Sequence, residues 1–172
     1  MTIIVETDRL RLSPWLFEDF EIMHGLTVDD RMRTFLGPTP SSREDSFNRL
    51  MRSAGCWHYF GWGPFKAVDK NSGEVVGGLG LFRAMRDLGS DFDPFPEAGW
   101  TVRAQHWGTG FATEGMRAIL DWFDREHGGR TVCIISPGHT ASERIAEKLG
   151  YRPIGLADYK DEPVMRFARD PA

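Results

Sequence analysis

The segment RAQHWGTGFATEG, residues 103–115, places glycines at 108, 110 and 115 where a stretch with helical periodicity begins. The first N–H groups of a helix have no partner inside the helix, and the helix dipole gives that end a partial positive charge. Glycine lets the backbone approach an anion closely. The segment therefore predicts a strand-to-helix junction that holds a phosphate, although such a turn is about as often only a tight connection.

The pattern along the rest of the chain predicts an α/β fold. Period-2 alternation and short apolar runs predict strands over residues 9–15, 60–69, 75–85, 97–103, 131–136, 151–159 and 164–170. Apolar residues at helical spacing predict helices over residues 18–26, 41–55, 112–127 and 140–150. Ser41 and Glu44 have capping-box spacing at the start of the second helix.

Composition limits the class of protein. The 172 residues, 41% of them hydrophobic, predict one domain spanning residues 1–172. No apolar run approaches the roughly 20 residues of a membrane span, and the start is charged by residue 6, so we expect a cytoplasmic protein with no membrane partner. The net charge of -4 gives no footprint for a nucleic acid. Cys56 and Cys133 lack metal-ligand or disulfide spacing, so we expect no metal and two reduced core residues.

Two other phosphate-binding motifs fit poorly. A dinucleotide fingerprint needs G-x-G-x-x-G near an early strand, but Gly108 and Gly110 are followed by Thr113 and lie about two-thirds of the way along the chain. A P-loop ends in G-K-[ST], and the chain has no such triplet. The residues therefore disfavour both a dinucleotide and ATP or GTP as the ligand.

Two longer segments resemble a known family. WTVRAQHWGTGFATEG (residues 100–115) and HTASERIAEKLGY (residues 139–151) are similar to the acetyl-CoA-binding core of the GNAT N-acetyltransferases, in the branch of the RimJ and RimL ribosomal-protein N-terminal acetyltransferases. TDRLRL and GEVVGGLGLF match in type and order, so the resemblance covers nearly the whole chain. It implies a central mixed, mostly antiparallel sheet of six or seven strands, about four flanking helices, and acetyl-CoA as cosubstrate.

The cofactor motif of that family, Q/R-x-x-G-x-G/A, fits in two registers. One uses Gln105 with Gly108 and Gly110, and the other uses Trp107 with Gly110 and Ala112. The wording WGTGFATE resembles the RimJ/RimL-like branch and favours the second register. The resemblance then implies backbone contacts to pantetheine at the strand end and to pyrophosphate along the loop, at Val102, Gly108, Thr109, Gly110, Phe111, Ala112 and Thr113.

The second segment departs from the family pattern at two positions. Ser142 and the Lys-Leu-Gly-Tyr run match the pattern, but His139 stands where the branch has an Asn that contacts pantetheine. An imidazole can still make one hydrogen bond to the cofactor, so we expect His139 and Ser142 to lie beside it. Many members also carry a tyrosine general acid in this helix, and this chain has Ala146 there.

Two residues are candidates for the chemistry. Similar glutamates in this branch are thought to act as the base, directly or through water, which makes Glu97 our candidate; a solvated strand-end carboxylate is an equally good reading. Ser142 could protonate the leaving thiolate, or it could only cap its helix or contact the cofactor. The resemblance places the donor to the oxyanion at an N–H near Val102.

These residues predict acetyl-CoA-dependent N-acetylation of a primary amine. The acceptor is either a protein N-terminus or a small molecule, because nothing in the sequence separates the two. The alternatives are a non-catalytic acyl-CoA-binding or sensor domain and an interaction module, of which the second leaves the glycines unexplained. The protein is expected to be a monomer or a homodimer, and its exposed aromatic residues are compatible with a dimer.

Overall fold

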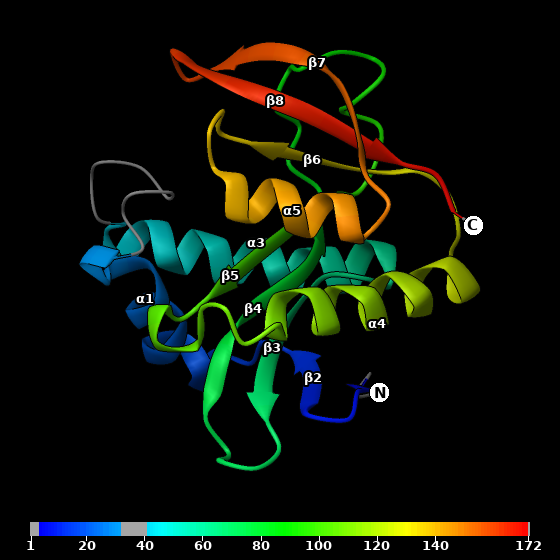
Figure 1. Cartoon of the computed structure of the whole chain (residues 1–172). Coiled ribbons are helices and arrows are strands. Elements are labelled where there is room, and N and C mark those ends of the chain that lie inside the picture. Colours follow the sequence, from blue (N-terminus) through cyan, green and yellow to red (C-terminus); the bar gives the residue numbers. More distant parts are fainter. Residues whose placement is uncertain (1–3, 32–40, 172) are drawn as a thin grey trace.

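The computed structural model describes residues 4–31 and 41–171, which form one eight-stranded sheet with helices on both faces (Figure 1). The strands are β1 (Val5–Glu6), β2 (Leu10–Pro14), β3 (Pro64–Asp69), β4 (Val75–Phe82), β5 (Glu97–Val102), β6 (Thr131–Ile135), β7 (Arg152–Tyr159) and β8 (Glu162–Arg169). The described helices are α1 (Phe20–Val28), α3 (Arg43–Phe60), α4 (Phe111–Glu126) and α5 (Thr140–Lys148), with short 3-10 turns at Phe17–Asp19 and Ala104–His106.

The sheet has the order β1-β2-β3-β4-β5-β6-β8-β7. Every neighbouring pair is antiparallel except β5 and β6, which are parallel and pair at one position, Glu97 with Val132. The expected mixed, mostly antiparallel sheet is therefore confirmed. It has one strand more than expected because the two-residue strand β1 adds an edge beside β2.

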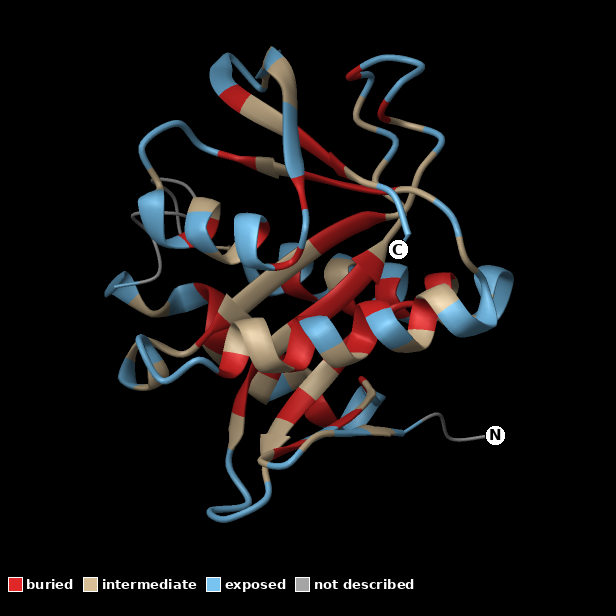
Figure 2. Cartoon of the chain, turned by 45° about the vertical axis from the view of Figure 1, so that its right-hand side comes forward, coloured by how far each residue is buried: buried red, intermediate tan, exposed pale blue. Residues whose placement is uncertain are grey.

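The helices cover the sheet from two sides. A Cβ on Gly115 of α4 would meet Leu79 Cδ1 of β4, whereas a Cβ on the next strand residue, Gly78, would meet the Trp15 ring. Successive side chains of a strand point to opposite faces of the sheet, so α4 and Trp15 lie on opposite faces. Trp15 packs with Met23 and Leu26, which places α1 on the face opposite α4. Figure 2 shows the buried residues concentrated in the central strands and on the helix surfaces that face them.

The second helix differs from the sequence prediction at both ends. Its capping box uses Ser42 and Asp45, one residue later than predicted, with Ser42 Oγ accepting from Asp45 N at 3.0 Å. The helix then continues to Phe60, where residues 60–63 were predicted to begin a strand. Gly61 ends it, because its φ of 74° is left-handed and suits glycine.

The structure bears on the two cysteines and on whether a helix could span a membrane. Cys56 and Cys133 are buried and unbonded, as expected for reduced core residues. Burial raises the pKa of the Cys133 thiol, which keeps it protonated at neutral pH. In residues 4–31 and 41–171, no helix is long and apolar enough to cross a membrane.

We expect Gly115→Ala to destabilise the protein although alanine is the better helix former. The new methyl group would lie 2.3 Å from Leu79 Cδ1 and 3.2 Å from Leu10 Cδ1, so the core must shift. Such overpacking costs about 1–3 kcal/mol. Gly25→Ala in α1 is the matched control, because no atom lies within 4 Å of its Cβ position. It should stabilise by about 0.5–1 kcal/mol. Urea unfolding of both variants measures the difference, and a stable Gly115→Ala protein would contradict this packing.

Candidate functional site

The glycine junction at the start of α4 leaves a row of N–H groups without partners. Gly110 is the N-cap residue with φ of 84°, and Gly108 has φ of 75°. The first helical N–H to find a backbone partner is that of Glu114, which donates to Gly110 O at 3.0 Å. Five N–H groups of the junction have no acceptor among the described residues. They are the backbone N–H groups of Gly108, Gly110, Phe111, Ala112 and Thr113. These donors line a cleft and form a cradle for an anion.

Thr109 differs from the other loop residues predicted to bind the cofactor. Its N–H and its hydroxyl both donate to His106 O, at 3.4 and 2.6 Å, and its carbonyl accepts from Arg9. The N–H and hydroxyl of Thr109 are therefore used inside the loop, and Thr109 does not line the cleft. Thr109 therefore shapes the loop, and its contact to a cofactor stays a prediction.

Trp107 ties the loop to the end of β5. Its Nε1 donates to Val102 O at 2.8 Å, while 46% of the residue stays exposed. Gln105, the corresponding residue in the other register, is exposed in the 3-10 turn and does not line the cleft. This geometry supports the register with Trp107. The bond from Trp107 occupies one of the two acceptor positions of Val102 O.

The strands β5 and β6 separate after their single point of pairing. Val132 N donates to Pro96 O at 2.9 Å, and β5 then continues to Val102 with β4 as its only strand neighbour in the described part of the chain. Arg103 N donates to Val76 O at 2.8 Å, which fixes the alternation of the antiparallel ladder between β4 and β5. That alternation directs the backbone groups of Ala98, Trp100 and Val102 toward the gap. The gap therefore offers an extended ligand an unpaired strand edge.

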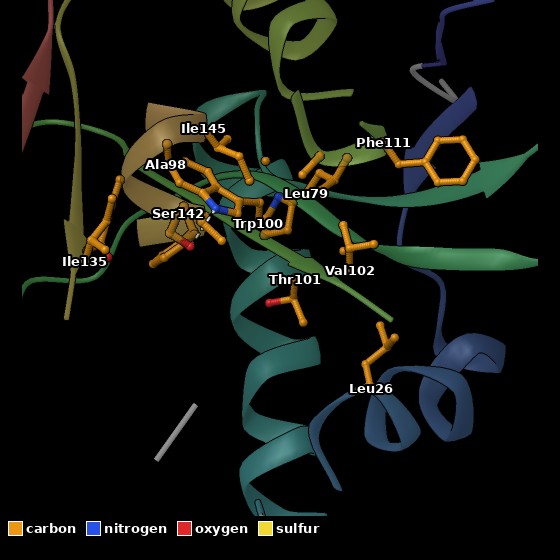
Figure 3. Close-up of a pocket in the computed structure, with 18 of the residues that line it drawn as sticks. Leu26, Leu79, Ala98, Trp100, Thr101, Val102, Phe111, Ile135, Ser142 and Ile145 are labelled. Carbon is orange, nitrogen blue, oxygen red and sulfur yellow. Dashed lines mark hydrogen bonds between the residues drawn. The ribbon is translucent and has the colours of Figure 1, made fainter. Parts of the chain in front are cut away.

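A cleft of about 780 Å³ passes through this gap from one face of the sheet to the other. On the α4 side it is lined by the glycine junction and by Ser142 and Ile145 of α5. On the other side it is lined by residues of α1 and α3, including Leu26. Figure 3 shows Ser142 and Ile145 on one side of β5, with Thr101 and Leu26 on the other. The cleft can thus hold one ligand on each face and bring the two together between β5 and β6.

Ser142 and His139 meet at the start of α5. Ser142 Oγ accepts from Trp100 Nε1 at 3.3 Å and lies 3.4 Å from His139 Nε2. Burial lowers the pKa of His139, so the imidazole is neutral at pH 7. All three side chains line the cleft, and Trp100 is a lining residue that the sequence analysis did not single out.

Glu97 is buried in an ion pair, which rules out a solvated strand end. It is 3% exposed, and its two carboxylate oxygens accept from Arg86 Nε at 2.7 Å and Nη2 at 2.9 Å. Burial raises the pKa of the Glu97 carboxyl, and the hydrogen bonds and charge of Arg86 offset this only in part. Glu97 lines the cleft at the point where β5 and β6 part. A carboxylate with a raised pKa in this position is a stronger base than an exposed one.

Comparison with known proteins identifies the family. The protein-family model of the acetyltransferase (GNAT) domain matches residues 9–152 of this sequence. The chain therefore belongs to the GNAT acetyltransferase family. The chain is 30% identical to a GnaT-family acetyltransferase from Bordetella pertussis, with a TM-score of 0.88 over 97% of this chain and 99% of that one. It is also 29% identical to the protein YkkB of Bacillus subtilis (strain 168), over 84% of this chain and 82% of the relative.

A more distant solved structure shares the fold. RimL, a ribosomal L7/L12 alpha-N-protein acetyltransferase in complex with coenzyme A, gives a TM-score of 0.78 at 15% identity. The match covers 98% of each chain. At that identity the likeness concerns the fold alone, so the RimL acceptor is not transferred to this chain.

Proposed function

We propose that the protein is an acetyl-CoA-dependent N-acetyltransferase of the RimJ/RimL-like branch that acts on a primary amine. The observation that carries the proposal is the cleft, which joins a cradle of free N–H groups on one face to a buried carboxylate at the strand gap. An acetyltransferase needs both: a site for the CoA phosphates and a group that accepts the proton of the amine. Membership of the GNAT family supports this reading.

The residues of the junction fit the cofactor. Five free N–H groups and the helix dipole suit a pyrophosphate, and beyond the two chain neighbours of Gly108 no atom of the described residues lies within 4 Å of a Cβ built on it. The N–H of Val102 and the unpaired edge of β5 would hold the pantetheine arm. Trp107 would act as a positioning residue by holding the loop to β5.

The remaining groups would carry the chemistry. When bound, acetyl-CoA supplies an activated acetyl group, whose C–S bond breaks as the C–N bond to the amine forms. Glu97 would take the proton from the attacking amine, directly or through water. Ser142 Oγ would give a proton to the leaving thiolate, with His139 Nε2 3.4 Å away as its hydrogen-bonding neighbour. A strand-end N–H near Val102 would donate to the oxyanion.

One observation favours a non-catalytic CoA-binding domain as the second candidate. Arg86 engages both oxygens of Glu97, and an ion-paired carboxylate is a weaker base than a free one in the same buried place. If the pair only stabilises the fold, the cleft would still bind CoA. Amine-dependent turnover separates the two candidates, because only the enzyme releases thiol faster when an amine is added.

We expect acetyl-CoA to raise the melting temperature of the protein. A ligand that binds only the folded state, present at 100 times its dissociation constant, stabilises it by about 2.7 kcal/mol. ATP and NAD at the same concentration should have no comparable effect, because the chain lacks the motifs that recognise them. Thermal unfolding monitored by circular dichroism measures the shift. Stabilisation by NAD without stabilisation by acetyl-CoA would contradict the proposed cofactor.

A further inference from the structure

We infer that the acceptor amine also carries an anionic group, a carboxylate or a phosphate, which binds Arg49 and Arg52 of α3. This inference rests on the proposed function and specifies the class of acceptor for the same cleft. It is carried by three side chains of α3 that occur at positions i, i+3 and i+4: Arg49, Arg52 and Ser53. Residues at this spacing share one helix face, and all three line the cleft.

Neither arginine forms an ion pair with a carboxylate among the described residues, although Arg49 feels the charge of Asp45 and Arg52 that of Glu97. Asp45, one turn before Arg49, is held by Ser42, whose N–H and hydroxyl donate to its Oδ2 at 3.0 and 2.7 Å. Arg52 lies over the ring of Phe82, with Cζ 5.1 Å from the ring centroid. Burial, followed by the charge of Arg52, lowers the pKa of Arg49. An anion between the two guanidinium groups would relieve both effects.

Ser53 adds a polar group that lacks a partner. The residue is 2% exposed, and its Oγ is buried without a hydrogen-bond partner within residues 4–31 and 41–171. A buried hydroxyl usually makes a hydrogen bond, since leaving it unmade is costly. Ser53 thus adds to the wall of the cleft, beside the two arginines, a polar residue whose hydroxyl has no acceptor among the described residues.

The position of this cluster assigns it to the acceptor and not to CoA. The free N–H groups lie at the start of α4, on the face of the sheet to which Leu79 points. Arg52 lies over Phe82, which points to the other face because it is four strand residues from Gly78. Arg144 and Lys148, which line the α5 wall on the CoA side, are available there to the phosphates of the cofactor. On the α3 side, the described lining residues include three arginines, Arg49, Arg52 and Arg86, and one carboxylate, Glu97, which pairs with Arg86 and also interacts electrostatically with Arg52. The acceptor half of the cleft is therefore cationic and would repel a diamine.

The test compares amines of matched length. 4-Aminobutyrate and O-phosphoethanolamine carry an anionic group, 1-aminobutane is neutral beyond its amine, and 1,4-diaminobutane carries a second cation. The wild-type protein should use the anionic amines with kcat/KM about 10- to 100-fold above the other two, the range expected for hydrogen bonds to charged groups. The two anionic amines also show whether carboxylate or phosphate is preferred.

Two variants locate the effect. Arg49→Met and Arg52→Met should each lower kcat/KM for the preferred anionic amine about tenfold or more, with little change for 1-aminobutane. Arg43→Met is the matched control, because Arg43 is an exposed arginine of the same helix that pairs with Glu21 and does not line the cleft. It should leave the preference intact.

Binding of the anionic amines is measured separately by thermal shift in the presence of CoA. A preference for 1-aminobutane or 1,4-diaminobutane in turnover would overturn the inference and leave the N-acetyltransferase function standing. Stabilisation by the anionic amines that Arg52→Met abolishes, without thiol release, would support the anion site and contradict the proposed activity. Absence of both turnover and stabilisation would overturn the inference.

Discussion

Gly108→Val is expected to reduce the affinity for acetyl-CoA roughly 100-fold or more, the effect of losing two charge-assisted hydrogen bonds. The valine side chain would enter the space beside the free N–H groups at the start of α4, where no protein atom lies within 4 Å of the Cβ position. Isothermal titration with acetyl-CoA measures the loss. Gly110→Val should act in the same way, from the N-cap position of the helix.

A control separates this loss from backbone strain. Gly73, in the turn between β3 and β4, has φ of 74° and an open Cβ position, which matches the φ of 75° at Gly108. Gly73→Val should therefore lose a similar 1–2 kcal/mol or so of stability from the left-handed conformation and keep its affinity for CoA. Gln105→Ala should also keep it, since Gln105 does not line the cleft. Equal loss of affinity in Gln105→Ala and Gly108→Val would contradict the register that uses Trp107.

Glu97→Gln is expected to lower the rate of amine acetylation about 100-fold at neutral pH, within the range for loss of a general base. The amide cannot accept a proton, whereas the carboxylate can. Part of the rate should return at high pH, where more of the amine is already neutral. Affinity for acetyl-CoA should stay nearly unchanged. Initial rates from about pH 6 to 9.5, with the best acceptor, measure the effect.

Arg86→Gln is the matched control for loss of the ion pair. Breaking a buried pair by removing one partner costs about 3–5 kcal/mol, so both variants should be less stable in urea unfolding. Arg86→Gln keeps the carboxylate and removes a group that lowers the pKa of Glu97, so that pKa should rise further. The acidic limb of the pH–rate profile of Arg86→Gln should therefore move to higher pH. At pH values above this limb the variant should retain activity. Equal rates at all pH values in Glu97→Gln and wild type would remove Glu97 from the mechanism.

The fold was most predictable where one pattern dominates. The helical spacing of apolar residues predicts α4 to within one residue, and the apolar run at residues 132–135 matches the interior strand β6. The last turn of α3 was missed because its aromatic residues also suit a strand. Trp57 instead packs edge-on against Phe65, with ring centroids 4.9 Å apart, and this tertiary contact decides the conformation.

The site was predictable in its backbone and less so in its side chains. Glycines before a helix indicate free N–H groups from sequence alone, and five of the six loop residues named from the sequence have such groups in the described structure. The hydroxyl of Thr109 turns back onto its own loop, to His106 O, and no pattern in the sequence indicates this bond. The pair between Arg86 and Glu97 spans 11 residues of loop and strand without periodicity, so only the fold brings it together.

The most direct test of the central claim is the initial rate of thiol release from acetyl-CoA with and without a primary amine, with the mass of the amine product measured in parallel. We expect release that depends on the amine and an acetylated product that forms in equal amount. Tight binding of acetyl-CoA without amine-dependent release, for any member of a broad amine panel, would contradict the proposed acetyltransferase activity and favour a CoA-binding domain.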